Sequence, residues 1–306
     1  MSLIISILCP CYNEEETIPV FFQKIIPILE SLKEPFEIVC VNDGSRDSTL
    51  EVLLSFARCD NRVKVLDLSR NFGKEAALTA AIDYALGDAV IPIDVDLQDP
   101  PELIPEMVAK WREGYEVILA RRIDRSSDSL MKRITAKIFY RFHNIVSRPH
   151  LPENVGDFRL MDRCVVEAVK SLHEHHRFMK GLFAWVGFKE WTIGYVRQPR
   201  TSGKSKFNAW RLWKFALEGI TSFSTFPLTI WLYLGSLISL CSFCYGAFIF
   251  FKTIILGIEL PGYASSICLI LFFGGLQLLG IGIIGEYLGR TYIESKQRPV
   301  YIARSF

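Results

Sequence analysis

Residues that can bind a metal ion or a nucleotide stand directly after three short apolar runs near the N-terminus. If these runs are parallel strands, their carboxyl ends lie at one edge of a sheet, where nucleotides bind in open α/β folds. The polar residues then converge on one site. They form three groups: Pro10, Tyr12, Asn13 and Glu14; Asp43 and Ser45; and Asp94, Asp96 and Gln98.

Asp94 and Asp96 are separated by a single residue, so both carboxylates are within reach of one divalent cation. Hard oxygen ligands suit Mg²⁺ or Mn²⁺, which bind one or two carboxylates together with substrate phosphates. A single acidic strand end has a simpler interpretation, because Asp43 alone would also serve as a helix N-cap. Three acidic strand ends at one edge favour a binding site.

Basic side chains must neutralise a diphosphate here, because the sequence has no GxxxxGK[ST] phosphate loop. The polar segment 200–206 precedes a run of aromatic residues, and we expect it to close on a phosphate as a mobile loop. The alternative is a basic linker attracted to anionic lipid. The candidate phosphate ligands are Lys74, Arg121, Arg122, Arg200, Lys204 and Lys206.

The spacing of apolar residues predicts strands that alternate with helices over the first 120 residues. Near-continuous apolar strands of this kind indicate a mostly parallel sheet covered on both faces, an α/β fold. The predicted strands are Leu3–Leu8, Glu37–Val41, Val63–Leu68, Ala89–Val95 and Glu116–Leu119. The predicted helices are Thr17–Leu32, Ser48–Ala57, Lys74–Leu86 and Leu103–Arg112.

The composition excludes some classes of protein and divides the chain in two. The 306 residues carry 35 Lys and Arg against 33 Asp and Glu, a net charge of +2, which gives no argument for nucleic-acid binding. Half of the residues are hydrophobic, which excludes a disordered charged protein. From Phe226 to Gly285 the charged residues are Lys252 and Glu259 alone.

Two uncharged segments, Thr229–Phe251 and Tyr263–Ile284, are long enough to cross a membrane. As helices they reach roughly 33–35 Å, against about 30 Å for the hydrocarbon core of a bilayer. Basic residues lie outside this hairpin, so the positive-inside rule places both termini in the cytoplasm. The alternative is a buried helical hairpin of a soluble protein. Six of the eight cysteines lie in apolar runs, namely Cys9, Cys11, Cys40, Cys241, Cys244 and Cys268, and we expect free thiols rather than disulfides.

Two further segments interleave basic and apolar residues. Residues 126–148 have helical spacing and predict either a helix on an anionic membrane surface or an ordinary amphipathic helix packed on the sheet. Residues 207–226 combine aromatic and basic side chains, which is typical of the membrane interface. We therefore predict a catalytic domain over 1–206, an interfacial segment over 207–226, a transmembrane hairpin over 227–289 and a cytoplasmic tail over 290–306.

Six motifs in order resemble glycosyltransferase family 2 and its GT-A fold: PCYNEE, VNDGS, RNFGKEAAL, DVDLQDPPE, GDFRLMDR and SGKSKF. Together with the hairpin they resemble, more narrowly, the bactoprenol glucosyltransferases and the related dolichol-phosphate mannose synthases. The resemblance covers Pro10 to about Lys206. The QxxRW signature of processive polysaccharide synthases is missing, which favours transfer of a single sugar.

The resemblance implies a role for each matching residue. Pro10, Tyr12, Glu14 and Asp43 would hold the base and ribose of a nucleotide sugar, with Asn13 and Ser45 beside them. Asp94, Asp96 and Gln98 would bind Mg²⁺ or Mn²⁺ and the diphosphate. Asp157 would lie beside the acceptor as the candidate base. Lys74, Arg122, Arg200, Lys204 and Lys206 would meet donor or lipid phosphates.

The resemblance thus implies an inverting hexosyltransferase of the bacterial inner membrane that moves glucose from UDP-glucose to undecaprenyl phosphate. The partners are a nucleotide sugar, a polyprenyl phosphate and the bilayer, with no nucleic acid, and small residues in the spans make a homo-oligomer plausible. Three alternatives stay open: transfer from GDP-mannose, synthesis of a glycolipid on a hydroxyl acceptor, and a non-catalytic subunit for sugar-lipid translocation.

Overall fold

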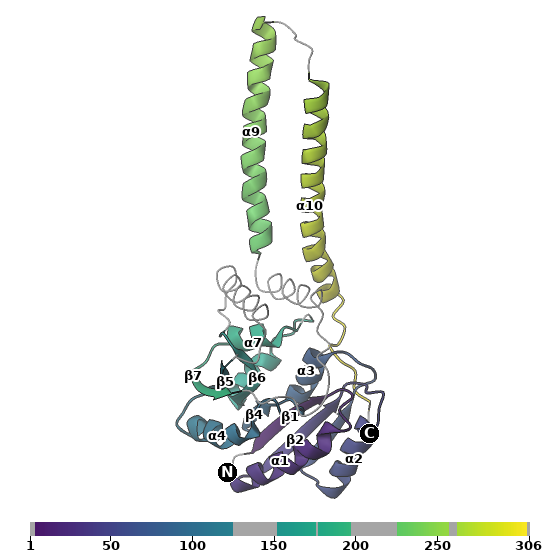
Figure 1. The fold of residues 1–306 in the computed structure, drawn as a ribbon, viewed down its shortest axis with the longest axis vertical. Coiled ribbons are helices and arrows are strands. Elements are labelled where there is room, and N and C mark those ends of the chain that lie inside the picture. The colour runs from purple at the N-terminus through teal and green to yellow at the C-terminus, as the bar shows by residue number, and fades with distance from the viewer. Residues whose placement is uncertain (1–3, 125–151, 176, 197–224, 257–261, 305–306) are drawn as a thin grey trace. The chain divides into compact units, whose positions relative to one another are not determined.

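The chain folds into two compact units (Figure 1). The computed structural model describes residues 4–124, 152–175, 177–196, 225–256 and 262–304. The first unit comprises Met1–Gly219 together with Arg298–Phe306, and the second comprises Ile220–Gln297. The segments 126–148 and 207–226, for which we predict amphipathic and interfacial structure, fall almost wholly outside the described residues.

The first unit contains the predicted alternation of strands and helices, which confirms the α/β fold. All five predicted strands and all four predicted helices are present, with ends that differ by a few residues. The strands are β1 Ile5–Cys11, β2 Phe36–Asn42, β3 Val63–Asp67, β4 Ala89–Pro92, β5 Val117–Asp124, β6 Val155–Asp162 and β7 Glu190–Val196. The helices are α1 Thr17–Ser31, α2 Thr49–Cys59, α3 Lys74–Tyr84, η1 Pro101–Leu103, α4 Ile104–Arg112, α6 Arg163–Lys170 and α7 Met179–Trp185.

The strands form one mixed sheet in the order β3-β2-β1-β4-β6-β5-β7. The pairs β1–β2, β1–β4, β2–β3 and β5–β7 are parallel, whereas β6 runs antiparallel to both β4 and β5. In the described sheet β6 is thus the one reversed strand. The carboxyl ends of β2, β1 and β4, which are neighbours, lie at the same edge.

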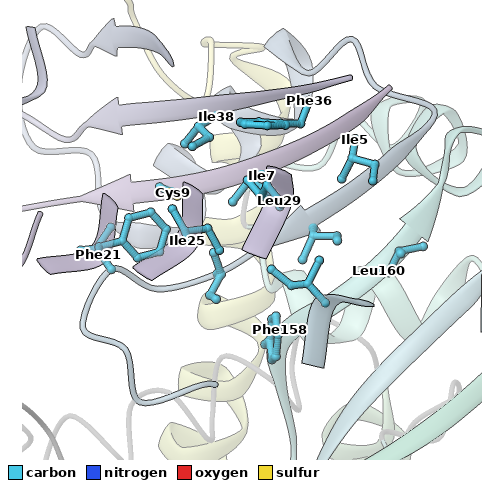
Figure 2. Packing of buried hydrophobic residues seen from close by; sticks show 14 of the residues in the cluster. Ile5, Ile7, Cys9, Phe21, Ile25, Leu29, Phe36, Ile38, Phe158 and Leu160 are labelled. Carbon is cyan, nitrogen blue, oxygen red and sulfur yellow. The ribbon is translucent and has the colours of Figure 1, made fainter. Parts of the chain in front are cut away.

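One face of the sheet is covered by α1, whose apolar side chains recur at helical spacing. Ile5, Ile7 and Cys9 of β1 point to this face because alternate residues of a strand share a side. Figure 2 shows them beside Phe21, Ile25 and Leu29 of α1 and Phe158 and Leu160 of β6. The opposite face carries α3, which contacts β1 and β2.

Strand β6 separates apolar from charged residues by the same alternation. Phe158 and Leu160 are buried in the cluster under α1. Asp157 and Arg159 therefore point to the other face of the sheet, the side that α3 covers. The reversed strand thus carries charged groups to the face from which the N-terminus of α3 approaches.

The second unit consists of two long helices, α9 Phe226–Leu256 and α10 Tyr263–Ser295, which contact each other. Each contains a stretch long and apolar enough to cross a membrane, Leu228–Phe248 in α9 and Phe272–Ser295 in α10. In the most apolar part of these stretches, 0 % of the residues are buried in α9 and 6 % in α10. A buried hairpin of a soluble core does not fit such exposure. Close packing of α9 and α10 depends on Gly280, because a Cβ there would lie 2.6 Å from a ring carbon of Trp231.

Residues 298–304 lie against the first unit rather than continuing α10. The Ser69 N–H donates to the Ile302 carbonyl at 2.8 Å, and the Arg304 N–H donates to the Asp67 carbonyl at 2.9 Å. Ala303 forms an antiparallel bridge with Leu68, just beyond β3. We call these residues the C-terminal tail.

Candidate active site

The turn after β1 is tied to the turn after β2, as expected for a shared binding edge. The Asn13 N–H donates to Ser45 Oγ at 3.1 Å, and the Arg46 N–H donates to Asn13 Oδ1 at 2.9 Å. Asn13 has φ +55°, a left-handed conformation that asparagine tolerates better than most residues. Two of the predicted donor-binding residues therefore hold each other in place.

Asp43, at the end of β2, is 3 % exposed and accepts two backbone hydrogen bonds. The N–H groups of Phe72 and Gly73 donate to its two carboxylate oxygens at 2.7 and 2.9 Å. Burial raises the pKa of Asp43, and these two N–H groups partly offset that effect. Asp43 is thus not an N-cap of α2, the alternative that its position left open; it organises the loop that leads into α3.

The other residues predicted to hold the nucleoside surround this edge. Glu14 accepts the Thr17 hydroxyl at 2.7 Å, and its N–H donates to the Thr49 hydroxyl at 2.8 Å. Pro10 is half-buried in β1, and Tyr12 is 38 % exposed, which leaves a ring available for stacking on a base. These residues therefore lie in and around the turns at this edge of the sheet.

Asp94 and Asp96 lie in the loop that follows β4. The Gln98 N–H donates to Asp96 Oδ1 at 3.1 Å, and Leu97 between them has φ +54°. A buried leucine in this conformation is strained, and such strain persists where surrounding structure demands it, often at functional sites. The loop is therefore held in a shape that its sequence does not favour.

Lys74, the first residue of α3, joins two acidic residues, one in the loop after β4 and one in β6. Its ammonium lies 2.8 Å from Asp94 Oδ2 and 2.9 Å from Asp157 Oδ2. The reversed strand β6 and the loop after β4 thus meet at one cation. The structure brings together Asp94 and Asp157, which are 63 positions apart in the sequence.

Asp157 is held as an anion. Burial alone would raise its pKa, but the charges of Lys74, Lys180 and Arg159 outweigh burial and lower the pKa to about 2. Burial would lower the pKa of Lys74, yet Asp94 and Asp157 raise it above its ordinary value. The group is therefore an ion-paired cluster at neutral pH.

Glu75 is a third carboxylate in this cluster, beside Asp94 and Asp157, and it is not among the residues predicted from the sequence. It accepts the Met179 N–H at 3.1 Å, which ties α3 to α7. Burial, followed by the charge of Asp157, raises its pKa to about 7. Glu75 directly follows Lys74 within RNFGKEAAL, but nothing local in the sequence indicates that its side chain is buried.

Arg159 also went unrecognised. It is 3 % exposed, lies 4.3 Å over the ring of Phe183, and donates to the Gly156 carbonyl at 2.8 Å. Burial lowers the pKa of Arg159 to about 10, partly opposed by Asp157. The motif GDFRLMDR contains both residues, so it carries the counter-charge of Asp157 as well as Asp157 itself.

The predicted phosphate ligands divide between described and undescribed residues. Arg122 lies in β5, where its N–H donates to the Asn154 carbonyl at 3.0 Å. Arg200, Lys204 and Lys206 fall outside the described residues. Their predicted contact with phosphates stays a prediction.

The acidic side chains of the loop after β4 suit a divalent cation whose remaining ligands come from the substrate. Among the described residues no group of three or more His, Cys, Asp or Glu side chains surrounds a cation position. Mg²⁺ and Mn²⁺ do not need such a cage, because they bind through one or two carboxylates and substrate phosphates. Asp94 and Asp96 supply these two carboxylates, although the Asp94 carboxylate also forms an ion pair with Lys74.

Comparison with known proteins agrees with this geometry. The model of the family "Glycosyl transferase family 2" matches residues 6–170, more than half of the chain. The prophage bactoprenol glucosyl transferase homolog of Escherichia coli is 52 % identical over 300 residues, which cover 98 % of each chain. The bactoprenol glucosyl transferase of Shigella phage SfV is 52 % identical over 301 residues, again 98 % of each chain.

A solved structure supports the fold. Glucosyl-3-phosphoglycerate synthase from Mycobacterium tuberculosis, in complex with Mn²⁺, UDP-glucose and phosphoglyceric acid, is similar with a TM-score of 0.50 and 20 % identity, over 72 % of this chain and 78 % of that chain. The family match and the two relatives that cover nearly the full chain agree with the sheet and its acidic edge. The chain belongs to glycosyltransferase family 2, and its relatives within that family include the bactoprenol glucosyltransferases.

Proposed function

We propose that the chain transfers one glucose from UDP-glucose to a polyprenyl phosphate at the cytoplasmic face of the membrane. The proposal rests on nearly full-length identity of 52 % to bactoprenol glucosyltransferases, hairpin included. A polyprenyl phosphate stays in the bilayer because its chain is hydrocarbon, so an enzyme that glycosylates it must work at the membrane surface. The two apolar helices supply that attachment.

The state of Asp157 favours a phosphate acceptor over a hydroxyl acceptor. A phosphate monoester has a second pKa near 6 and is largely ionised at neutral pH, so it attacks the anomeric carbon without a base. A carboxylate with a pKa of about 2 is a weak base. Asp157 then orients the acceptor and holds Lys74, whereas a hydroxyl acceptor would require removal of a proton.

The departing diphosphate needs positive charge. Asp94 and Asp96 would hold Mg²⁺ or Mn²⁺, which would stabilise the charge that develops on the diphosphate. Lys74, 2.8 Å from Asp94, is near enough to add its own charge at that place. Asn13, Asp43 and Ser45 hold the two turns that would cradle the nucleoside.

One assay tests the reaction and its metal. The full chain in detergent is given radiolabelled UDP-glucose, undecaprenyl phosphate and Mn²⁺ or Mg²⁺, and extraction with organic solvent measures lipid-linked sugar. We expect transfer that EDTA stops and that Asp96→Asn lowers by about 100-fold or more, since loss of a charge-stabilising group costs roughly 10²–10³ in rate. Glu113→Gln, an exposed carboxylate paired with Lys110, is the matched control and should retain full transfer.

Two results would contradict the proposal: EDTA-resistant transfer that Asp96→Asn leaves unchanged, or sugar transfer from GDP-mannose but not UDP-glucose. A parallel assay with diacylglycerol addresses the hydroxyl-acceptor alternative. Glu75 keeps that alternative in view, because its pKa of about 7 suits a general base. Glucosylation of diacylglycerol in preference to the phosphate would replace our proposal with that reaction.

A further inference from the structure

The C-terminal tail completes the edge of the sheet beside the predicted nucleotide site. Strand β3 is at one end of the strand order, so its outer edge has no neighbouring strand among the described residues. The tail pairs antiparallel just beyond β3 through the Ser69–Ile302 and Arg304–Asp67 backbone hydrogen bonds. Tyr301 anchors the same segment to α3, its hydroxyl donating to Asp83 Oδ2 at 3.0 Å.

Arg304 also supplies a counter-charge to a buried acid. Its guanidinium lies 3.2 Å from Asp67 Oδ2 and donates to the Ser69 carbonyl at 3.4 Å. The Asp67 side chain is 3 % exposed and that of Arg304 is 61 % exposed. A buried carboxylate is unfavourable unless it is paired and hydrogen-bonded, so the orientation of Asp67 depends on what the tail offers it.

Asp67 is connected by hydrogen bonds to the turns at the predicted nucleotide site. Its Oδ1 accepts the side-chain amide of Asn42 at 2.6 Å, and Asn42 is 2 % exposed. The other end of that amide, Asn42 Oδ1, accepts the Ser45 N–H at 3.3 Å. Ser45 Oγ in turn accepts the Asn13 N–H. A continuous series of hydrogen bonds therefore runs from Arg304 to the turns after β2 and β1.

We propose that Arg304 is a positioning residue for the donor nucleotide, acting through Asp67 and Asn42 on the turn 43–45. It touches no substrate itself. The inference rests on the proposed function, because it assumes that this turn binds the nucleoside part of the donor. It assigns to the tail a role in donor affinity and none in acceptor binding.

The test compares Arg304→Ala with two other variants of the full chain in detergent. Calorimetric titration with UDP and Mn²⁺ measures donor-site affinity, and steady-state transfer gives separate KM values for UDP-glucose and undecaprenyl phosphate. We expect Arg304→Ala to weaken UDP binding and raise the donor KM by roughly 3- to 10-fold, where tenfold is 1.4 kcal/mol. The acceptor KM and kcat should stay within about twofold of wild type, and Arg304→Lys should recover most of the loss.

Arg298→Ala is the matched control, since it removes the same side chain from an exposed position in the same segment. Unchanged UDP affinity in Arg304→Ala overturns the proposal, as does an equal loss in Arg298→Ala. If Arg304→Ala does not fold, Arg304→Gln, which keeps a hydrogen-bonding tip, carries the same comparison. Wild-type protein that binds UDP but transfers no sugar refutes the proposed function while leaving this inference testable by titration.

Discussion

At the scale of single residues, Lys74 decides the charge of the candidate active site. Its ammonium forms ion pairs with both Asp94, in the loop after β4, and Asp157, on β6. Without it, the carboxylates of Asp94 and Asp157 would lose the cation that both contact, which disfavours ionisation of both, and Asp157 would keep only the more distant charges of Lys180 and Arg159. Because the pKa of Asp157 is lowered to about 2, the side chain is an anion at neutral pH, and we infer that it acts by position and charge.

Glu75 gives this cluster a measurable pH dependence. Its folded pKa of about 7 is raised above the ordinary 4.5, so the folded state binds the proton more tightly than the unfolded state. The resulting stabilisation is complete below pH 4.5 and is lost as the pH rises to about 7. We expect Glu75→Gln, which mimics the protonated form, to be more stable than wild type at pH 8 but not at pH 4.5.

Melting curves of the detergent-solubilised protein in EDTA, taken from pH 4.5 to 8, measure this difference. The gap between variant and wild type should widen by up to about 1.4 kcal/mol for each pH unit between the two pKa values. Glu113→Gln, whose carboxylate is exposed, should follow wild type throughout. Parallel curves for Glu75→Gln and wild type would show that Glu75 is ionised in the folded state.

The sequence indicates those residues of the candidate site that follow strands, but not those that depend on packing. Asp43, Asp94 and Asp96 could be selected as candidates because strand ends can be read from apolar runs; their roles stay predictions. Glu75 and Asp67 could not, because nothing local says that a charge in a helix or at the end of a strand is buried. Their roles come from α7 and the C-terminal tail, which approach from far along the chain.

At the scale of elements, the turn after β2 depends on close contact with the loop before α3. Gly44 has φ +60°, and a Cβ there would lie 2.5 Å from the Asn71 nitrogen and 2.9 Å from Arg70 Cα. Alanine at this position meets both a steric clash with backbone and a strained conformation. We expect Gly44→Ala to lower the free energy of unfolding by about 2–4 kcal/mol and to weaken UDP binding.

Gly114 is the control for conformation alone. It has φ +90°, and a Cβ there would meet no atom of the described residues within 4 Å. Gly114→Ala should therefore cost about 1 kcal/mol and leave UDP binding unchanged. Thermal melting and UDP titration of both variants make the comparison, and equal effects would mean that the contact with the Arg70–Asn71 backbone is unimportant.

The elements themselves were predictable where one pattern ran without interruption. The strands β1 to β5 are mainly apolar, and α1, α2, α3 and α4 have helical spacing. Strand β6 escaped prediction because Asp157 and Arg159 interrupt its apolar residues, and β7 because most of its residues are exposed. Both strands belong to the half of the sheet in which the strands are ordered β4-β6-β5-β7 rather than as they follow along the chain. No local pattern specifies that β6 runs antiparallel to its neighbours.

At the scale of the whole molecule, the membrane orientation can be tested with native cysteines. Cys59 and Cys164 are exposed in the first unit. If that unit is cytoplasmic, a membrane-impermeant maleimide should leave both unlabelled in intact spheroplasts and label them in inverted vesicles. Glu259→Cys, placed between α9 and α10 in the sequence and made in a chain whose Cys59 and Cys164 are replaced by serine, should show the opposite pattern.

Detergent-solubilised protein, in which every exposed thiol is reachable, provides the reference for full labelling. Labelling of Cys59 and Cys164 of the native protein from outside intact spheroplasts would contradict the predicted orientation, because it would place the first unit and its donor site outside the cytoplasm. Cys241 and Cys244 lie within the Leu228–Phe248 span and should react with the impermeant reagent in neither preparation.

The first unit is discontinuous, since it needs residues 298–304 from beyond the 78-residue second unit. A ribosome adding roughly 5–20 residues per second takes about 4–16 seconds to pass the intervening segment. During that interval the nascent sheet has an unprotected border at β3, and Asp67 lacks its guanidinium. Translation order therefore places synthesis of the two long helices before synthesis of the segment that completes the first unit.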